Sequence, residues 1–162
     1  MRAALARTAG ALLVVIVAVG VVFVVGMRTK SPPVQNAVRR MGRASKPLVL
    51  RSAGTPGAYA SVVRHVGRTS GRDYETPVVA VPTDEGFVIA LPYGTTTDWL
   101  RNVLAAGGAV IVREGESHAV DRPEIVPRAV GNPHFPPQEQ RSHRLFNVND
   151  FLVVRRAPLA DA

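Results

Sequence analysis

A long apolar run near the N-terminus constrains this chain more than any other feature. The twenty residues between Arg7 and Arg28 carry no charge, and the stretch from Ala9 to Met27 is rich in valine. About 20 apolar residues cross a hydrocarbon core of about 30 Å. Because no water there can satisfy a bare backbone, we predict a transmembrane helix despite the many β-branched residues. A cleaved signal peptide would have a shorter apolar region and a small-x-small cleavage site. The sequence therefore favours an uncleaved single-pass anchor over residues 1–30.

The charges that flank this run predict its orientation. Two arginines and the terminal amine precede it, whereas seven basic residues follow it before residue 52. Basic flanks stay on the cytoplasmic side, so we predict a cell-membrane protein with its N-terminus outside and its domain in the cytoplasm. Residues 31–57 then form a basic juxtamembrane segment. Residues 34–43 are compatible with a short helix on the anionic inner leaflet and equally with a solvated linker after Pro32 and Pro33.

The distribution of charge argues against a nucleic-acid-binding protein. The chain has 162 residues and a formal net charge of +8. Residues 1–51 carry nine basic and no acidic residues, whereas residues 52–162 carry 11 basic and 12 acidic residues, a net charge of −1. A nucleic-acid-binding domain is expected to carry its own basic face. The absence of cysteine excludes disulfides, Cys-ligated zinc and a cysteine nucleophile.

Short β-type runs separated by Gly and Pro follow residue 58. Two helices interrupt or follow them: one starts at Thr97 or Asp98 and ends at Gly107-Gly108, and a second runs from Pro136-Pro137 to about Phe146. We predict a mainly β (α+β) domain over residues 58–156, a small closed or nearly closed barrel, with a tail over 157–162. The predicted strands are Tyr59–Val66, Pro77–Val81, Gly86–Leu91, Ala109–Arg113, Ser117–Asp121 and Ile125–Val130.

Most familiar catalytic motifs are missing. The chain has no dinucleotide-binding or nucleotide-triphosphate loop and no nucleophile elbow. Its four histidines show no H-x-x-x-H spacing, so we predict no metal site, and each histidine is expected to be a surface or hydrogen-bonding residue.

Two segments remain that suit ligand binding. The first is Gly67–Arg72 (GRTSGR), in which flanking glycines can turn N–H groups inward and two arginines can bind phosphate or carboxylate. The second, Leu91–Leu104, leads through a Gly/Thr-rich loop to a helix start that carries Trp99, the only tryptophan. Such a helix start offers unpaired N–H groups, and an indole can pack on a planar ring. Taken singly, each segment also suits a plain structural role: an ordinary turn, or a plug at the barrel end.

In this order and at this separation, the two segments resemble the deazaflavin-dependent nitroreductase family, the split-β-barrel oxidoreductases that bind coenzyme F420. The resemblance rests on GRTSGRDYETPV (67–78), GFVIALPYG (86–94) and DWLRNVLAAGGAVI (98–111), supported by KPLVLRSAG (46–54) and FLVVRR (151–156). It covers roughly residues 35–156. It implies a split, FMN-binding-like β-barrel of about six antiparallel strands.

The resemblance also implies the residues that hold the cofactor. The arginine turn, as we call Gly67–Arg72, and the next strand would bind the phosphate and tail of the cofactor. The strand end before the helix would lie against the cofactor ring, and the helix start would close the site. Carried over, these are Arg68, Thr69, Ser70, Tyr74, Glu75, Thr76, Pro77, Val78, Ala90, Leu91, Pro92, Tyr93, Asp98, Trp99, Leu100, Arg101 and Asn102. No catalytic side chain is obligatory, because the cofactor carries the chemistry; Tyr93 is a candidate proton donor.

The implied function is a membrane-anchored oxidoreductase that transfers a hydride from reduced F420 to an electron-poor, lipophilic acceptor such as a quinone. Two departures from the family pattern bear on cofactor binding: Thr69 stands where Lys or Arg is frequent, and Glu75 adds a negative charge near the expected tail. A non-enzymatic lipid- or fatty-acid-binding barrel of the same superfamily is the alternative, and a relative that binds FMN, or less readily haem, is a third. Membrane lipid and a small-molecule acceptor are the expected partners, and the barrel is compatible with a monomer or a homodimer.

Overall fold

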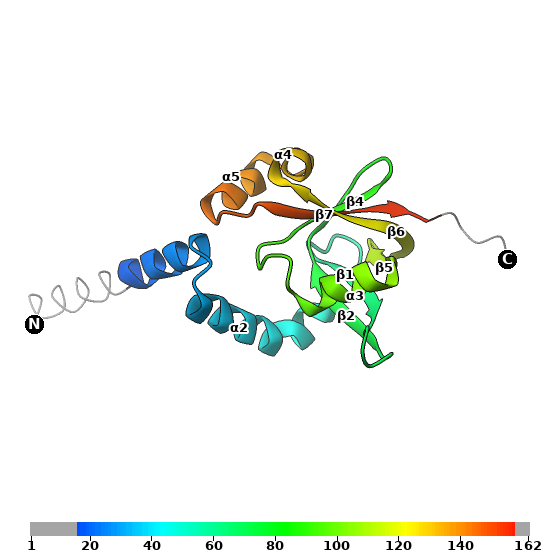
Figure 1. The fold of residues 1–162 in the computed structure, drawn as a ribbon, viewed down its shortest axis with the longest axis horizontal. Helices are drawn as coiled ribbons and strands as arrows, with labels where there is room; N and C mark the ends of the chain where they lie inside the picture. The colour runs from blue at the N-terminus through cyan, green and yellow to red at the C-terminus, as the bar shows by residue number, and fades with distance from the viewer. Residues whose placement is uncertain (1–15, 158–162) are drawn as a thin grey trace, which may run out of the picture.

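The computed structural model describes residues 16–157 of the chain. The first fifteen and last five residues lie outside the described part, and they include the start of the predicted anchor and most of the predicted tail. The first described element is a helix over Ile16–Arg28. It points away from the domain, as Figure 1 shows.

A sharp bend follows this apolar helix. Lys30 has a left-handed φ of 57°, and α2 (Pro32–Leu50) starts at two prolines, which suit a first helical turn. The two helices are bent by 101° relative to each other. Among residues 16–157 no single helix is long and apolar enough to cross a membrane, and only this bent pair together has that length and composition. Residues 34–43 thus lie in a helix, one longer than the short helix of the sequence prediction.

The domain is built on one curled antiparallel sheet, a seven-stranded half-barrel. The strand order is β2-β1-β5-β6-β7-β4-β3. The two edge strands, β2 (Asp73–Val78) and β3 (Ala80–Pro82), are consecutive in sequence and separated only by Val79. The chain therefore turns a corner at Val79, and the sheet must curl to bring its two edges to that corner. The other strands are β1 (Ser61–Val66), β4 (Gly86–Ala90), β5 (Gly108–Arg113), β6 (Glu116–Pro127) and β7 (Asp150–Arg156).

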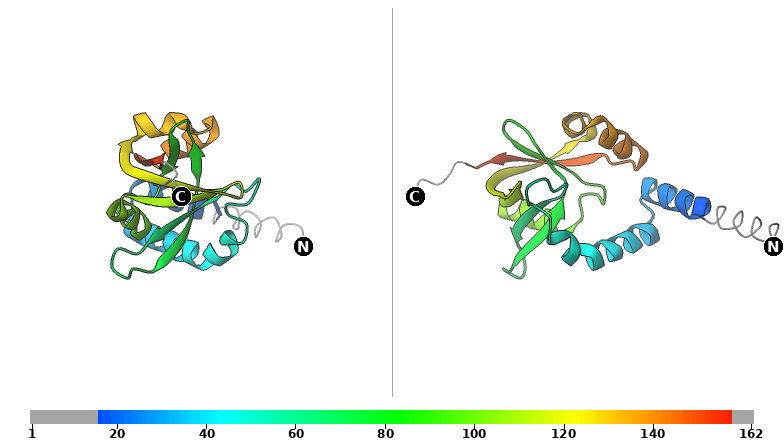
Figure 2. Two further views of the ribbon diagram at one scale, coloured as in Figure 1. Left: turned by 90° about the vertical axis from the view of Figure 1, so that its right-hand side faces the viewer. Right: turned by 180° about the vertical axis from the view of Figure 1, so that it is seen from behind.

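Helices cover both sides of the curled sheet, as Figures 1 and 2 show. The inserted helix α3 (Asp98–Ala106) and α2 lie on one side, and α4 (Arg128–Gly131), the 3-10 turn η1 (Asn132–His134) and α5 (Pro137–Leu145) lie on the other. The predicted inserted helix and C-terminal helix are thereby confirmed. The structure ends in a further strand, β7, which the sequence analysis had identified only as part of the family resemblance.

The core lies on both faces of β4 and β7, because side chains alternate along a strand. Phe87 and Ile89 point into a cluster shared with Leu100 and Val103 of α3. Val88 belongs to a second cluster under α4 and α5, together with Phe135 and Phe151. The central residues of these two strands, Phe87–Ile89 and Phe151–Val154, are therefore all apolar rather than alternating, the pattern of strands buried on both faces.

Three strand predictions were wrong in their limits. The predicted strand Pro77–Val81 is divided between β2 and β3 at the Val79 corner, and β2 begins earlier, at Asp73. The predicted strands over Ser117–Asp121 and Ile125–Val130 are one strand, β6, with a register shift between Asp121 and Glu124. Arg122 has a left-handed φ of 49° there, so an irregularity within a strand resembled a strand end. Val130 lies in α4 rather than in a strand.

Candidate functional site

The arginine turn connects β1 to β2. Its geometry is set by two backbone bonds: the Gly67 N–H donates to the Arg72 carbonyl at 2.8 Å, and the Gly71 N–H donates to the Gly67 carbonyl at 2.8 Å. Gly71 has a φ of +65°, the left-handed region in which glycine carries no steric penalty. Arg68, Thr69 and Ser70 stand at the exposed tip of this turn.

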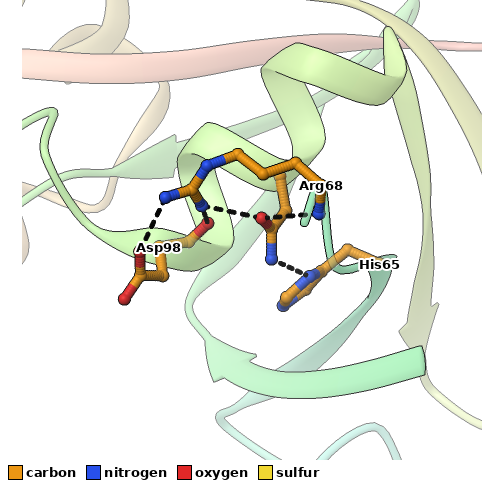
Figure 3. Close-up of polar contacts among 4 residues, drawn as sticks. His65, Arg68 and Asp98 are labelled. Carbon is orange, nitrogen blue, oxygen red and sulfur yellow. Dashed lines mark hydrogen bonds and ion pairs between the residues drawn. The ribbon is translucent and has the colours of Figure 1, made fainter. Parts of the chain in front are cut away.

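Arg68 joins the turn to the start of α3, as Figure 3 shows. One guanidinium nitrogen donates to the Asp98 carboxylate at 3.1 Å, and the other donates to Asn102 Oδ1 at 2.8 Å and to the Asp98 carbonyl at 3.4 Å. The two sequence segments that suit ligand binding therefore converge in space. A guanidinium has only five N–H groups, and these three bonds already use most of the Arg68 donors. Few donors of Arg68 are therefore left to bind a phosphate.

Asn102 continues this network into the interior. It is 6% exposed, and besides the guanidinium it accepts the Arg68 backbone N–H at 3.2 Å. Its side-chain amide donates to His65 Nδ1 at 3.2 Å, and His65 Nε2 lies 3.1 Å from Thr76 Oγ1. With Nδ1 as acceptor, the proton of neutral His65 must sit on Nε2 and donate to Thr76. Two motif residues of the family resemblance, Arg68 and Asn102, thus hold each other in place.

His65 is confirmed as a hydrogen-bonding residue, and it is buried. Burial lowers the pKa of its imidazole, and the positive charge of Lys46 on α2 lowers it further. His65 is therefore neutral at neutral pH, as its acceptor role towards Asn102 requires. Its ring also stacks on that of Tyr74, with 5.8 Å between centroids.

The alternation along β2 separates the predicted tail-binding residues into two faces. Tyr74 and Thr76 lie on the face of His65, as their cross-strand register shows. Glu75 points the other way, where its carboxylate pairs with Arg64 at 3.0 Å on an exposed surface. The charge of Glu75 therefore lies on the opposite face of β2 from Tyr74 and Thr76, and the Arg64 guanidinium compensates it.

The loop from Leu91 to Thr97 connects β4 to α3. Leu91 is 3% exposed and belongs to the core, so only its neighbours are accessible to a ligand. The carbonyls of Pro92 and Tyr93 accept hydrogen bonds from Lys30 Nζ at 3.4 Å and from an Arg39 guanidinium nitrogen at 3.2 Å. Two basic side chains from outside the barrel thus contact this loop. The sequence analysis missed them as site residues because only the bend after Arg28 brings α2 to the barrel.

Two buried polar atoms at this loop have no hydrogen-bond partner among the described residues: Arg39 Nε and Thr97 Oγ1. Thr97 is the N-cap residue of α3, yet its side chain makes no capping bond. Buried donors without a hydrogen-bond partner are uncommon in folded proteins, so a bound ligand is one way to satisfy these two atoms. Burial also raises the pKa of the Tyr93 phenol, against the charge of Arg39, which lowers it.

Of the predicted residues on α3, only some face outward. Leu100 is fully buried in the core, and Trp99 is partly buried against it. Arg101 is exposed, and Asp98 is 86% exposed while it holds Arg68. The structure therefore brings together the arginine turn, the β2 face of Tyr74 and Thr76, and the helix start, and it places Leu91 and Leu100 in the core. Ala90 and Val78 are half-buried at strand ends, and Pro77 lies on the Glu75 side of β2.

Two cavities lie away from this junction. One, of about 460 Å³, has a largely apolar lining that includes Val79, Val81 and Phe135, and Tyr59 and Arg113 also line it. The other, of about 500 Å³, lies beside α4 and the end of α5 and is lined by Pro127, Arg128, Ala129, Asn132, Pro133, Arg144 and Asn149. Within residues 16–157 no group of three or more acidic or histidine side chains is arranged to hold a metal ion.

In comparisons with known proteins, no family model matches this chain and no curated protein matches its sequence. The resemblance to the deazaflavin-dependent family therefore stays a prediction, carried by the two motifs and by their junction at Arg68.

Proposed function

We propose that the protein is a membrane-anchored oxidoreductase that binds coenzyme F420 between the arginine turn, the β4–α3 loop and α2. The observation that carries this proposal is a pair of buried polar atoms at the loop, Arg39 Nε and Thr97 Oγ1, that have no hydrogen-bond partner within residues 16–157. A negatively charged ligand would supply acceptors for both. The residues present fit such a ligand, because Lys46 adds positive charge near His65 and Arg39 adds positive charge near Tyr93.

When bound, reduced F420 would supply a hydride to an electron-poor, lipophilic acceptor such as a quinone. Trp99, with its indole only partly buried, offers a flat surface for a planar ring. Tyr93 keeps its phenolic proton at neutral pH because burial raises its pKa, so its hydroxyl can donate a proton to a reduced acceptor. The apolar helix over Ile16–Arg28 would hold the domain at the bilayer, where a lipophilic acceptor is concentrated.

The role of Arg68 changes in this proposal. Its bonds to Asp98 and Asn102 make it a positioning residue, which holds the turn against α3, rather than the main ligand of a phosphate. Arg39 takes over as the principal cation for the ligand, since its Nε is buried and has no hydrogen-bond partner in the described part of the chain.

Fluorescence titration tests this assignment. The full chain in detergent is titrated with F420, and quenching of Trp99 is followed. We expect saturable binding, and Arg39→Gln should weaken it about tenfold or more, because a bond to a charged group contributes about 1.5–3 kcal/mol. Arg40→Gln is the matched control. Arg40 is next to Arg39 in the sequence but is exposed, so this substitution should leave the affinity for F420 unchanged. Equal affinities for both variants, or no saturable binding, would refute the cofactor site.

A lipid- or fatty-acid-binding barrel is the second candidate. The cavity of about 460 Å³ with walls of Val79, Val81 and Phe135 favours it, because small-molecule sites are mostly apolar and concave. Native mass spectrometry of the full chain purified from cells separates the candidates. A co-purifying fatty acid without deazaflavin supports this function, and a yellow FMN-containing protein supports the flavin-binding relative.

A further inference from the structure

The cavity beside α4 and α5 has the chemistry of an anion site. Arg128 and Arg144 both line it, with the amides of Asn132 and Asn149, and no acidic residue lines it within residues 16–157. In the same described part of the chain, neither arginine has a carboxylate within ion-pair distance, although six other basic side chains do. Two unpaired guanidinium groups around one hollow attract an anion.

Asn132 provides a built donor in this cavity. It is only 9% exposed, and its Oδ1 lies 2.7 Å from His143 Nδ1. The imidazole is held in place by Phe135 and Phe151, whose ring centroids lie 4.8 and 5.3 Å away. If His143 Nδ1 carries the proton, Oδ1 is the acceptor, and the amide NH₂ of Asn132 has no acceptor among the described residues. That donor is left for a ligand in the cavity.

The position of the cavity identifies the source of the anion. The Arg28 side chain, at the end of the apolar helix, donates to the carbonyls of Arg144 and Leu145 at 3.5 and 3.4 Å. Asn147 donates back to the Arg28 carbonyl at 3.3 Å, and Phe23 packs edge-on against Phe146 with centroids 6.0 Å apart. Figures 1 and 2 show the end of α5 beside the end of the apolar helix. Arg144 thus lies where a lipid headgroup would stand if that helix enters a bilayer.

We propose that this cavity binds the phosphate headgroup of an anionic phospholipid, with Arg128 and Arg144 as its cations and Asn132 as a neutral donor. The proposal rests on the membrane anchoring proposed above and is independent of F420. Basic pockets next to a membrane-inserted helix are suited to anionic headgroups, which carry the charge that a zwitterionic lipid lacks. The bound lipid would tie the C-terminal helices to the base of the anchor and fix the height of the domain above the bilayer.

Native mass spectrometry of the full chain in detergent tests the site, with phosphatidylglycerol and phosphatidylcholine as probes. We expect one phosphatidylglycerol to be retained per chain and phosphatidylcholine to be retained far less. Arg144→Gln should lower the retention of phosphatidylglycerol about tenfold or more, equivalent to about 1.4 kcal/mol. Arg141→Gln, the same charge change one turn earlier on α5, is the matched control. Asn149→Asp puts a carboxylate at the rim without changing side-chain size and should also lower retention.

Three results would overturn the proposal: equal retention of the two lipids, equal effects of Arg141→Gln and Arg144→Gln, or full displacement of the lipid by inorganic phosphate. The last result would assign the cavity to free phosphate. Flotation of the full chain with phosphatidylcholine vesicles tests the anchor separately. If the chain floats but shows no preference for phosphatidylglycerol, the membrane anchor is supported and the lipid site is refuted. If the chain binds phosphatidylglycerol in detergent but does not float, the lipid site is supported and the membrane anchor is refuted.

Discussion

Removal of the Asn102 side chain should strongly destabilise the domain. Asn102→Ala deletes three hydrogen bonds of 3.2, 2.8 and 3.2 Å. The Arg68 guanidinium keeps Asp98 and reaches water, since its side chain is 33% exposed. The buried His65 Nδ1 and the Arg68 backbone N–H lose their partners, at about 1–3 kcal/mol for each unsatisfied group. We therefore expect a loss of about 3 kcal/mol in the free energy of unfolding.

Urea unfolding of the full chain in detergent measures this loss. Trp99 is the only tryptophan in the chain and lies three residues before Asn102 on the same helix, so its fluorescence reports on this junction. For a domain of this size, about 3 kcal/mol corresponds to a fall in melting temperature of roughly 12–24 °C. Arg101→Ala, on the exposed side of the helix, is the control and should change the free energy of unfolding by less than about 0.5 kcal/mol.

A second variant separates hydrogen bonding from packing. Asn102→Asp keeps an acceptor for both Arg68 donors, but an ionised carboxylate cannot donate to His65 Nδ1 and can only accept a bond from that nitrogen once Nδ1 is protonated. We expect it to be more stable than Asn102→Ala and to gain stability relative to wild type as the pH falls. If the two variants are equally stable, or if Asn102→Ala loses less than about 1 kcal/mol, the network does not hold the turn to the helix and the reasoning fails.

Three further predictions concern His65, Glu75 and Phe151. Because burial and Lys46 lower the pKa of His65, the unfolded chain binds more protons than the folded chain below about pH 6.5. The wild type should therefore lose stability as the pH falls through that value, and His65→Asn should lose less. Urea unfolding at about pH 7.5 and about pH 5.5 measures the difference. Glu75→Gln removes an exposed ion pair and should change the free energy of unfolding by no more than about 1 kcal/mol in urea titration; a larger loss would show that its charge matters to the fold. Phe151→Ala empties the centre of the second core cluster and should cost about 3–5 kcal/mol in thermal or urea unfolding, and a cost below about 1 kcal/mol would place Phe151 outside the core.

The elements with strong local signals were predictable. Gly107 ends α3 with a left-handed φ of 68°, and two prolines start α5, so both helices could be located from single residues. Glycine-containing turns separated most strands for the same reason. The register shift in β6 and the corner at Val79 have no comparable signal, because they are set by which strand pairs with which. The limits of those strands were therefore wrong.

The candidate site divides along the same line. The sequence by itself determined the charge-poor N-terminal run, the basic segment behind it, the predominance of strands and the two motif segments, since each depends on composition or on spacing between near neighbours. Only the tertiary structure decided that the Arg68 guanidinium binds Asp98 and Asn102. The structure also decided that Glu75 lies on the opposite face of β2 from Tyr74 and Thr76. Finally, it decided that α2 brings Arg39 to the β4–α3 loop. Those outcomes join residues thirty or more positions apart, or depend on which face of a strand is turned inward. Such contacts follow from strand pairing and helix packing, which no local pattern encodes.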